Sequence, residues 1–175
     1  MQETTKRLVF RYDRVYFYTR TVFYLILLLF ALAVTLSSHD PGALLPWLVV
    51  LFAILVAAII ILGISPLLTS HWLTRTRLVL RRGWYFKAVI PLIEVASVGS
   101  YDAETRLGLS LSFNSRILFV TSSRHDLVEI KLKRPRRFVL VLGLKATRIV
   151  FNVDNPDEFL TAMRERLSSL APVKA

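Results

Sequence analysis

The chain has 175 residues, enough for one domain of ordinary size, and it carries a formal net charge of +11. It is 54% hydrophobic, which is high for a soluble protein of this length, and it has no cysteine, which excludes disulfides and thiolate chemistry. The hydrophobic residues are unevenly spread, because residues 21–70 contain no Lys or Arg while basic residues lie on both sides of them.

Residues 1–15 form a short basic segment, and two long apolar runs follow it. A helix needs about 20 apolar residues to cross the hydrocarbon core of a bilayer. The runs 16–36 and 44–68 meet this length, so they predict two transmembrane helices over residues 16–68. The polar stretch 37–42, which ends in Pro-Gly, is typical of a tight turn, so the two helices are expected to form an antiparallel hairpin. No signal peptide is expected.

The basic residues predict the orientation of this hairpin. Lys and Arg precede the first run and follow the second, and the turn at 37–42 has neither. Under the positive-inside rule, both termini should therefore be cytoplasmic, in a multi-pass protein of the cell (inner, cytoplasmic) membrane. Aromatic residues gather at interfaces, and Trp47 and Trp72, which bracket the second run, are candidate interfacial anchors.

The two apolar runs carry almost no ionisable residues. Intramembrane functional sites usually contain charged or titratable residues, and the centres of these runs, residues 22–36 and 48–62, have no charged residue. An anchor is therefore favoured over a pore or transporter. Gly63 and Pro66 should kink or end the second helix, while Gly63, Ala57 and Ala58 permit close helix packing.

Residues 70–175 predict a separate cytoplasmic domain rich in strands, because the apolar pattern changes there from continuous to alternating. A hairpin is expected within residues 78–90, with its turn near Gly83. Further strands are expected at 93–98, 107–113, 117–121, 127–132, 138–142 and 148–153.

A C-terminal helix is expected after these strands. Asn155 suits the cap position and Pro156 the first helical position, and the acids Asp157 and Glu158 favour the positive end of the helix dipole. Apolar residues then recur at helical spacing and mark one face, which should cover the strands. These residues are Phe159, Leu160, Met163, Leu167 and Leu170.

Three stretches together resemble a known family. They are residues 73–83 (LTRTRLVLRRG), 90–98 (IPLIEVASV) and 154–159 (DNPDEF). With the preceding span pair, they look like the membrane-anchored bacterial or archaeal pleckstrin-homology (PH)-like domain proteins. The resemblance implies an α+β chain in which a two-helix hairpin is followed by a bent, antiparallel, seven-stranded PH-like β-barrel capped by the C-terminal α-helix. It implies no catalytic residue and fixes no ligand.

Two groups of basic residues are candidate contacts for lipid head groups or for a partner. The first follows the second span, and the second is expected in a loop between late strands, interrupted by Pro135. Each Lys or Arg near an anionic membrane surface contributes about 1 kcal/mol of attraction to it. The alternative is solvated charge that follows the positive-inside bias. The candidates are Arg75, Arg77, Arg81, Arg82, Lys133, Arg134, Arg136 and Arg137.

Trp84 has two interpretations. In the alternating pattern of its strand it packs in the core, whereas at a protruding hairpin tip it is an interfacial anchor beside Arg81 and Arg82. For the carboxylates Asp102 and Glu104, two residues apart in an expected loop, an ordinary surface role is favoured.

No pattern in the sequence indicates catalysis, a cofactor or a metal site: the three His are scattered, and no glycine-rich phosphate loop or nucleophile motif occurs. We therefore expect a non-enzymatic binding or scaffolding protein at the cytoplasmic membrane face. The alternatives are an anionic-lipid-sensing module and an accessory subunit of a membrane enzyme or transporter complex. The expected partners are the bilayer, with anionic lipids as candidates, and an unknown membrane-associated protein. Nucleic acid is not expected, and a homo-oligomer is compatible with the sequence.

Overall fold

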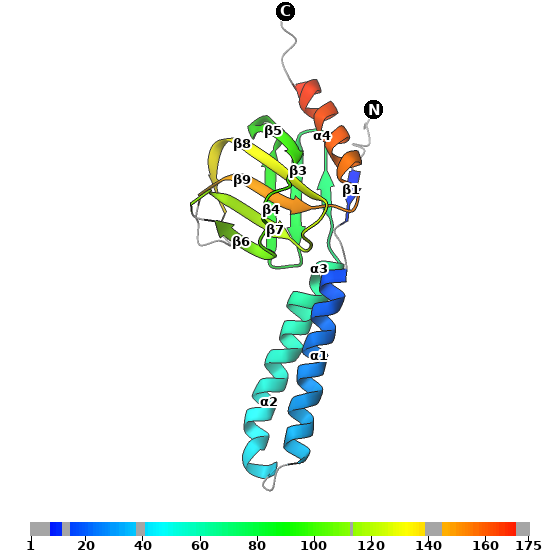
Figure 1. Cartoon of the computed structure of the whole chain (residues 1–175), viewed down its shortest axis with the longest axis vertical. Helices are drawn as coiled ribbons and strands as arrows, with labels where there is room; N and C mark the ends of the chain where they lie inside the picture. Colours follow the sequence, from blue (N-terminus) through cyan, green and yellow to red (C-terminus); the bar gives the residue numbers. More distant parts are fainter. Residues whose placement is uncertain (1–7, 12–14, 38–40, 113, 139–144, 171–175) are drawn as a thin grey trace, which may run out of the picture.

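The computed structural model describes residues 8–11, 15–37, 41–112, 114–138 and 145–170. The molecule is elongated, with a helical hairpin at one end and a β-rich domain at the other (Figure 1). The first strand and the last helix both lie in the domain, so the hairpin is an insertion in the sequence between the first strand and the rest of the domain.

The hairpin consists of α1 (Val15–Leu36) and α2 (Pro41–Ala58), the second continued by the π-helix η1 (Ile59–Ile64) and the single turn α3 (Ser65–Leu67). By length and composition, two stretches could cross a membrane, Phe17–Leu36 and Leu45–Leu67. Only 6% and 17% of them is buried by the rest of the chain, which distinguishes them from the core helices of a soluble protein. The predicted pair of apolar helices is therefore confirmed.

Helix α1 and η1 pack closely at the domain end of the hairpin. A Cβ added to Gly63 would collide with Oγ1 of Thr21, so only glycine allows this approach. The Thr21 hydroxyl donates to the carbonyl of Phe17 at 2.9 Å, which satisfies it within its own helix. A π-helical segment changes the direction of the residues that follow it, and Ser65 and Pro66 are buried directly after η1.

The first sheet has four antiparallel strands in the order β1 (Leu8–Phe10), β2 (His71–Leu73), β3 (Arg77–Arg82) and β4 (Phe86–Pro91). Strand β1 pairs with β2 through Leu8 and Leu73. Residues 8–10 of the segment before the hairpin are therefore part of the first sheet. The hairpin expected around Gly83 is confirmed as β3 and β4.

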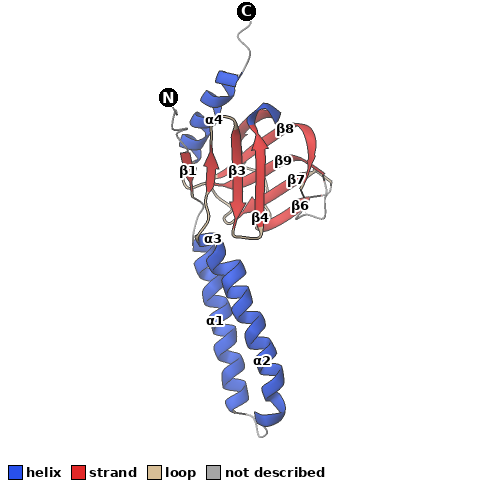
Figure 2. Cartoon of the chain, turned by 180° about the vertical axis from the view of Figure 1, so that it is seen from behind, coloured by secondary structure: helices blue, strands red, loops and turns tan. Residues whose placement is uncertain are grey.

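The second sheet has five strands in the order β5-β8-β9-β7-β6. They are β5 (Val95–Ser100), β6 (Gly108–Ser112), β7 (Ile117–Thr121), β8 (Leu127–Arg137) and β9 (Lys145–Asn152). Strands β7 and β9 pair in parallel. The expectation of one closed antiparallel barrel is therefore wrong: the strands form two sheets that lie face to face with crossing strands (Figure 2).

Some element limits also differ from the predictions. The strand expected at 93–98 begins only at Val95, because Leu92–Glu94 form the 3-10 turn η2 after Pro91. Strand β8 runs to Arg137, five residues past the expected end. Most of the strand expected at 138–142 lies outside the described residues.

Helix α4 (Pro156–Leu170) begins as predicted, with Pro156 at its first position and two acids in its first turn. Its apolar face covers the end of the two sheets, where Phe159 is fully buried. The Phe159 ring meets Phe10 of β1 and Phe151 of β9 edge-on, at centroid distances of 5.0 and 5.4 Å. One core thus joins both sheets and α4.

Candidate functional site

A set of contacts joins the apolar hairpin to the domain at a junction, and Arg82 lies at its centre. This last residue of β3 is only 3% exposed, although it is charged. Its guanidinium donates to the carbonyl of Thr121 at 2.6 Å and to the hydroxyl of Tyr85 at 3.0 Å. Its Cζ lies 5.5 Å from the ring of Phe17 in α1, a cation–π contact. One buried side chain therefore joins both sheets to the first helix.

The turn between β3 and β4 is fastened to the end of the second helix. The N–H of Gly83 donates to Oγ1 of Thr69, and the N–H of Trp84 donates to Oγ of Ser65, both at 2.9 Å. Gly83 has a φ of +61°, a left-handed conformation that suits glycine, and an added Cβ would meet Ser65. The turn thus sits directly on the last helical residues.

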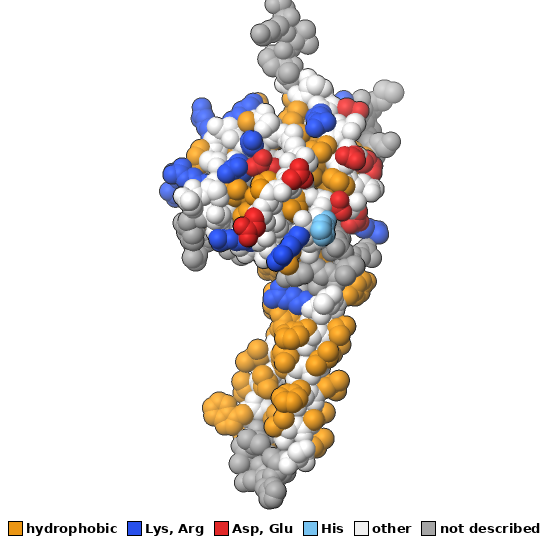
Figure 3. Space-filling view, in the orientation of Figure 1, with side chains coloured by type: hydrophobic (Ala, Val, Ile, Leu, Met, Phe, Trp, Pro, Cys, Tyr) orange, Lys and Arg blue, Asp and Glu red, His pale blue; other side chains and the backbone are white. Residues whose placement is uncertain are grey.

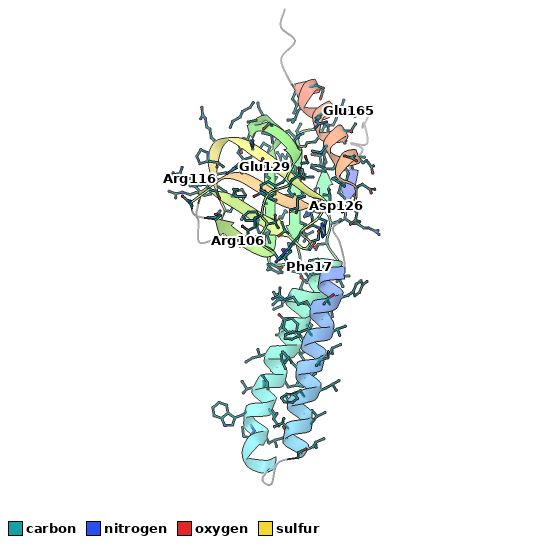
Figure 4. The ribbon with its side chains drawn as sticks, in the orientation of Figure 1. Phe17, Arg106, Arg116, Asp126, Glu129 and Glu165 are labelled. Carbon is teal, nitrogen blue, oxygen red and sulfur yellow. The ribbon has the colours of Figure 1, made fainter. Side chains whose placement is uncertain are left out.

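The contacts continue from Arg82 to the loop between β5 and β6. Thr121 accepts from Arg82 through its carbonyl, and its hydroxyl donates to the carbonyl of Arg106 at 2.5 Å. Figure 4 shows Arg106 at the lower margin of the domain, above and beside Phe17. This margin, where strand ends face the hairpin, is therefore fixed in place by hydrogen bonds.

His71, the first residue of β2, is buried beside the junction. Its Nδ1 accepts from the N–H of Arg81 at 3.2 Å, and its ring meets that of Phe151 edge-on at 5.5 Å. Burial, and secondarily the charge of Arg82, lower the pKa of His71 from 6.5 to about 3. The imidazole is therefore neutral at physiological pH and serves as a hydrogen-bond acceptor in the core.

Comparisons with models of protein families, with curated proteins and with solved structures found no match. The resemblance to membrane-anchored PH-like proteins therefore stays a prediction.

The first group of basic candidates is split by the structure. Arg75 and Arg77 are exposed, and Arg81 is half-buried with its Cζ 5.6 Å from the ring of Trp72. Arg82 was expected to contact head groups, but its side chain is enclosed by Phe17 and by its hydrogen-bond acceptors. A charged residue beside a turn glycine gives no sign in the sequence of a partner 39 residues away.

The second basic group lies on strand β8, which corrects its expected position in a loop. Arg136 forms an ion pair with Glu94 at 2.7 Å, while Lys133, Arg134 and Arg137 are exposed. Figure 1 shows the far end of β8 at the flank of the domain, away from the end that meets the helices, and Figure 3 shows Lys and Arg side chains along this flank. The structure does not bring the two basic groups together.

The three candidate anchors occupy different places. Trp47 is 75% exposed on α2 near the turn of the hairpin, and Trp72 is half-buried in β2. Trp84 is 64% exposed in the β3–β4 turn, so its core interpretation is wrong and its place at a hairpin tip is confirmed.

A polar cleft of about 430 Å³ opens between the loops after β5 and β7 and the start of α4. Asp102, Arg124, His125, Asp126 and Asp157 line it. Among the described residues no group of three or more His, Cys, Asp or Glu could hold a metal ion. The mixed charges and the size of the cleft suit a polar group of a partner better than an apolar ligand.

Proposed function

We propose that this protein is a membrane-anchored, non-enzymatic binding or scaffolding protein that holds its β-domain in a fixed orientation at the cytoplasmic membrane face. The observation that carries the proposal is the junction. Arg82 links both sheets to α1, while Ser65 and Thr69 hold the β3–β4 turn on the second helix. A flexible tether needs none of these contacts. They support instead a rigid attachment of the domain to the hairpin, which we call the rigid mount.

A rigid mount has a mechanical consequence. A domain confined to a membrane meets other membrane-bound molecules at a raised effective concentration, so weak contacts become sufficient for association. Fixed orientation adds selectivity, since the same surfaces always face sideways. These surfaces are the basic flank of β8 (Lys133, Arg134 and Arg137) and the polar cleft beside α4.

The membrane topology is tested first, and the absence of cysteine makes single-cysteine labelling clean. Ser37 lies at the end of α1 near the hairpin turn, and Ser169 lies exposed on α4. A membrane-impermeant maleimide added to intact cells should label Ser37→Cys and spare Ser169→Cys until the membrane is opened. Labelling of Ser169→Cys in intact cells would overturn the proposed orientation, and extraction of the full chain by alkaline carbonate would overturn the anchor.

The partner class is tested by photocrosslinking in the full chain within its native membrane. A photoreactive residue replaces exposed Arg134 on the β8 flank in one variant and exposed Ile26 on α1 in a second. A discrete protein adduct from position 134 supports the scaffold. If position 26 gives a protein adduct and position 134 gives none, the protein is an accessory subunit that binds through its hairpin. If position 134 gives only lipid adducts, the domain is a lipid-sensing module. Either outcome overturns the scaffold.

A further inference from the structure

The margin of the domain that faces the hairpin carries exposed side chains that the domain fold does not use. Trp84 is 64% exposed in the β3–β4 turn, and Leu107 is 40% exposed in the loop before β6, next to exposed Arg106. At the end of the second apolar stretch, Leu68 is 68% exposed. These side chains come from three separate segments, which hydrogen bonds through Ser65, Arg82 and Thr121 hold at the end of the domain that meets the hairpin.

The depth of Trp84 relative to the apolar helices is fixed by a hydrogen bond. Its N–H lies 2.9 Å from Oγ of Ser65, and Ser65 lies inside the apolar stretch Leu45–Leu67. The backbone of the turn is therefore level with the last turn of the second helix. An exposed indole that starts at this level reaches the boundary of any bilayer that the stretch crosses.

The loop with Leu107 is held at the same margin. Arg82 connects Phe17, near the start of the first apolar stretch, to Thr121, and Thr121 binds the carbonyl of Arg106. A tryptophan, leucines and an arginine at the end of apolar helices are the composition of an interfacial belt, where indole and guanidinium meet head groups and apolar side chains meet acyl chains.

We propose that Trp84, Leu68, Leu107 and Arg106 form a membrane-contacting margin that inserts into the phospholipid head-group region beside the hairpin. This inference rests on the proposed membrane anchor and adds that the domain itself binds the lipid surface. The occupant is lipid because the margin is continuous with the apolar surface of the helices, at the depth that Ser65 fixes. Insertion gives the mount a second attachment point, which prevents the domain from tilting on the hairpin.

The test uses tryptophan fluorescence of the full chain in phospholipid vesicles that contain brominated lipids. The double variant Trp47→Phe with Trp72→Phe leaves Trp84 as the reporter, and Trp72→Phe with Trp84→Phe leaves Trp47. A third reporter, Lys133→Trp in a background in which all three native tryptophans are Phe, lies on the flank of β8. Trp84 should be quenched by bromines close to the head groups, more strongly than by bromines at the chain ends, and the flank reporter should not be quenched.

The outcomes separate this inference from the anchor on which it rests. If Trp47 is quenched and Trp84 is not, the hairpin is inserted but the margin lies in water, and the inference is overturned. If neither is quenched, the membrane anchor itself fails. If a second copy or another protein covers Trp84, its emission is shifted to the blue without quenching by bromine, which also overturns lipid contact. A nitroxide at Leu107→Cys should show the same preference, with greater relaxation by oxygen than by a water-soluble nickel complex.

Discussion

The guanidinium carbon of Arg82 lies 5.5 Å from the centre of the Phe17 ring, and this contact joins the end of β3 to the start of the apolar helix α1. Phe17 is only 1% exposed, so the contact is enclosed. The same guanidinium holds Thr121 of the second sheet. The Arg82 side chain therefore contacts a helix and both sheets, which makes it the most informative residue to change.

Replacing Arg82 with Met should destabilise the domain by about 2 to 3 kcal/mol, since it leaves the Thr121 carbonyl and the Tyr85 hydroxyl without their donor in a buried site. Urea unfolding followed by fluorescence in detergent measures this change. The matched control is Arg77→Met, at an exposed position of the same strand, which should change the free energy of unfolding by less than about 0.5 kcal/mol.

The same variant should loosen the mount. Spin labels at Ser37→Cys and Ser169→Cys report the distance between the far end of the hairpin and α4, and the chain has no other cysteine. Arg82→Met should broaden that distance distribution, and Arg77→Met should leave it narrow. An unchanged distribution in Arg82→Met would show that the domain is held by other contacts.

Close helix packing gives a second prediction. Gly63→Ala should destabilise the hairpin because its new Cβ collides with the Thr21 hydroxyl, and Thr21→Ala should restore much of the loss because it removes that atom. The coupling between the two changes should be about 0.5 to 3 kcal/mol in a double-mutant cycle measured by unfolding in detergent. Gly99→Ala is the control, since an added Cβ there meets nothing within 4 Å.

His71 predicts a pH dependence of stability. The unfolded chain protonates this imidazole near pH 6.5, whereas the folded protein keeps it neutral until pH falls to about 3. The unfolded state therefore binds more protons in this window, so the contribution of His71 is present above pH 6.5 and is lost as pH falls. The free energy of unfolding should fall by about 1.4 kcal/mol per pH unit in this window.

The measurement compares urea unfolding between pH 7.5 and pH 4.5 for the natural chain and for His71→Gln, which keeps an acceptor for the Arg81 N–H. The part of the pH dependence of the free energy of unfolding that comes from His71 should disappear in the variant. His125→Gln, at an exposed position, is the control and should retain it. Equal slopes in the natural chain and His71→Gln would show that the group is not held neutral.

Local patterns were enough to predict the helices and most strands, because each depends on residues that are neighbours in the sequence. The apolar helices, the turn at Gly83 and the start of α4 at Pro156 all follow from such patterns. The way the strands combine depends on distant pairing. Leu8 pairs with Leu73 across the whole hairpin, and the parallel pairing of β7 with β9 breaks the expected antiparallel order.

The site was harder to predict than the fold, because its residues look ordinary where they stand. Ser65 and Thr69 are small polar residues at the end of an apolar run, and they bind a turn 14 to 19 residues later. Arg82 is an arginine in a basic stretch, and its burial depends on distant contacts with Thr121 and Phe17 that its sequence neighbours do not indicate. Polar residues at the end of an apolar helix are the one local signal for such a junction.

The strand before the hairpin gives the last prediction. Phe10 is 6% exposed and meets Phe159 at a centroid distance of 5.0 Å, whereas Val9, its neighbour on the other face of β1, is 53% exposed. Phe10→Ala should therefore cost about 3 to 5 kcal/mol in the free energy of unfolding, and Val9→Ala less than about 1 kcal/mol. Limited proteolysis of α4 in the full chain should accelerate in Phe10→Ala alone, because that helix loses an aromatic partner. Equal stability of the two variants would mean that residues 8–10 are a tail and that β2 is the edge of its sheet.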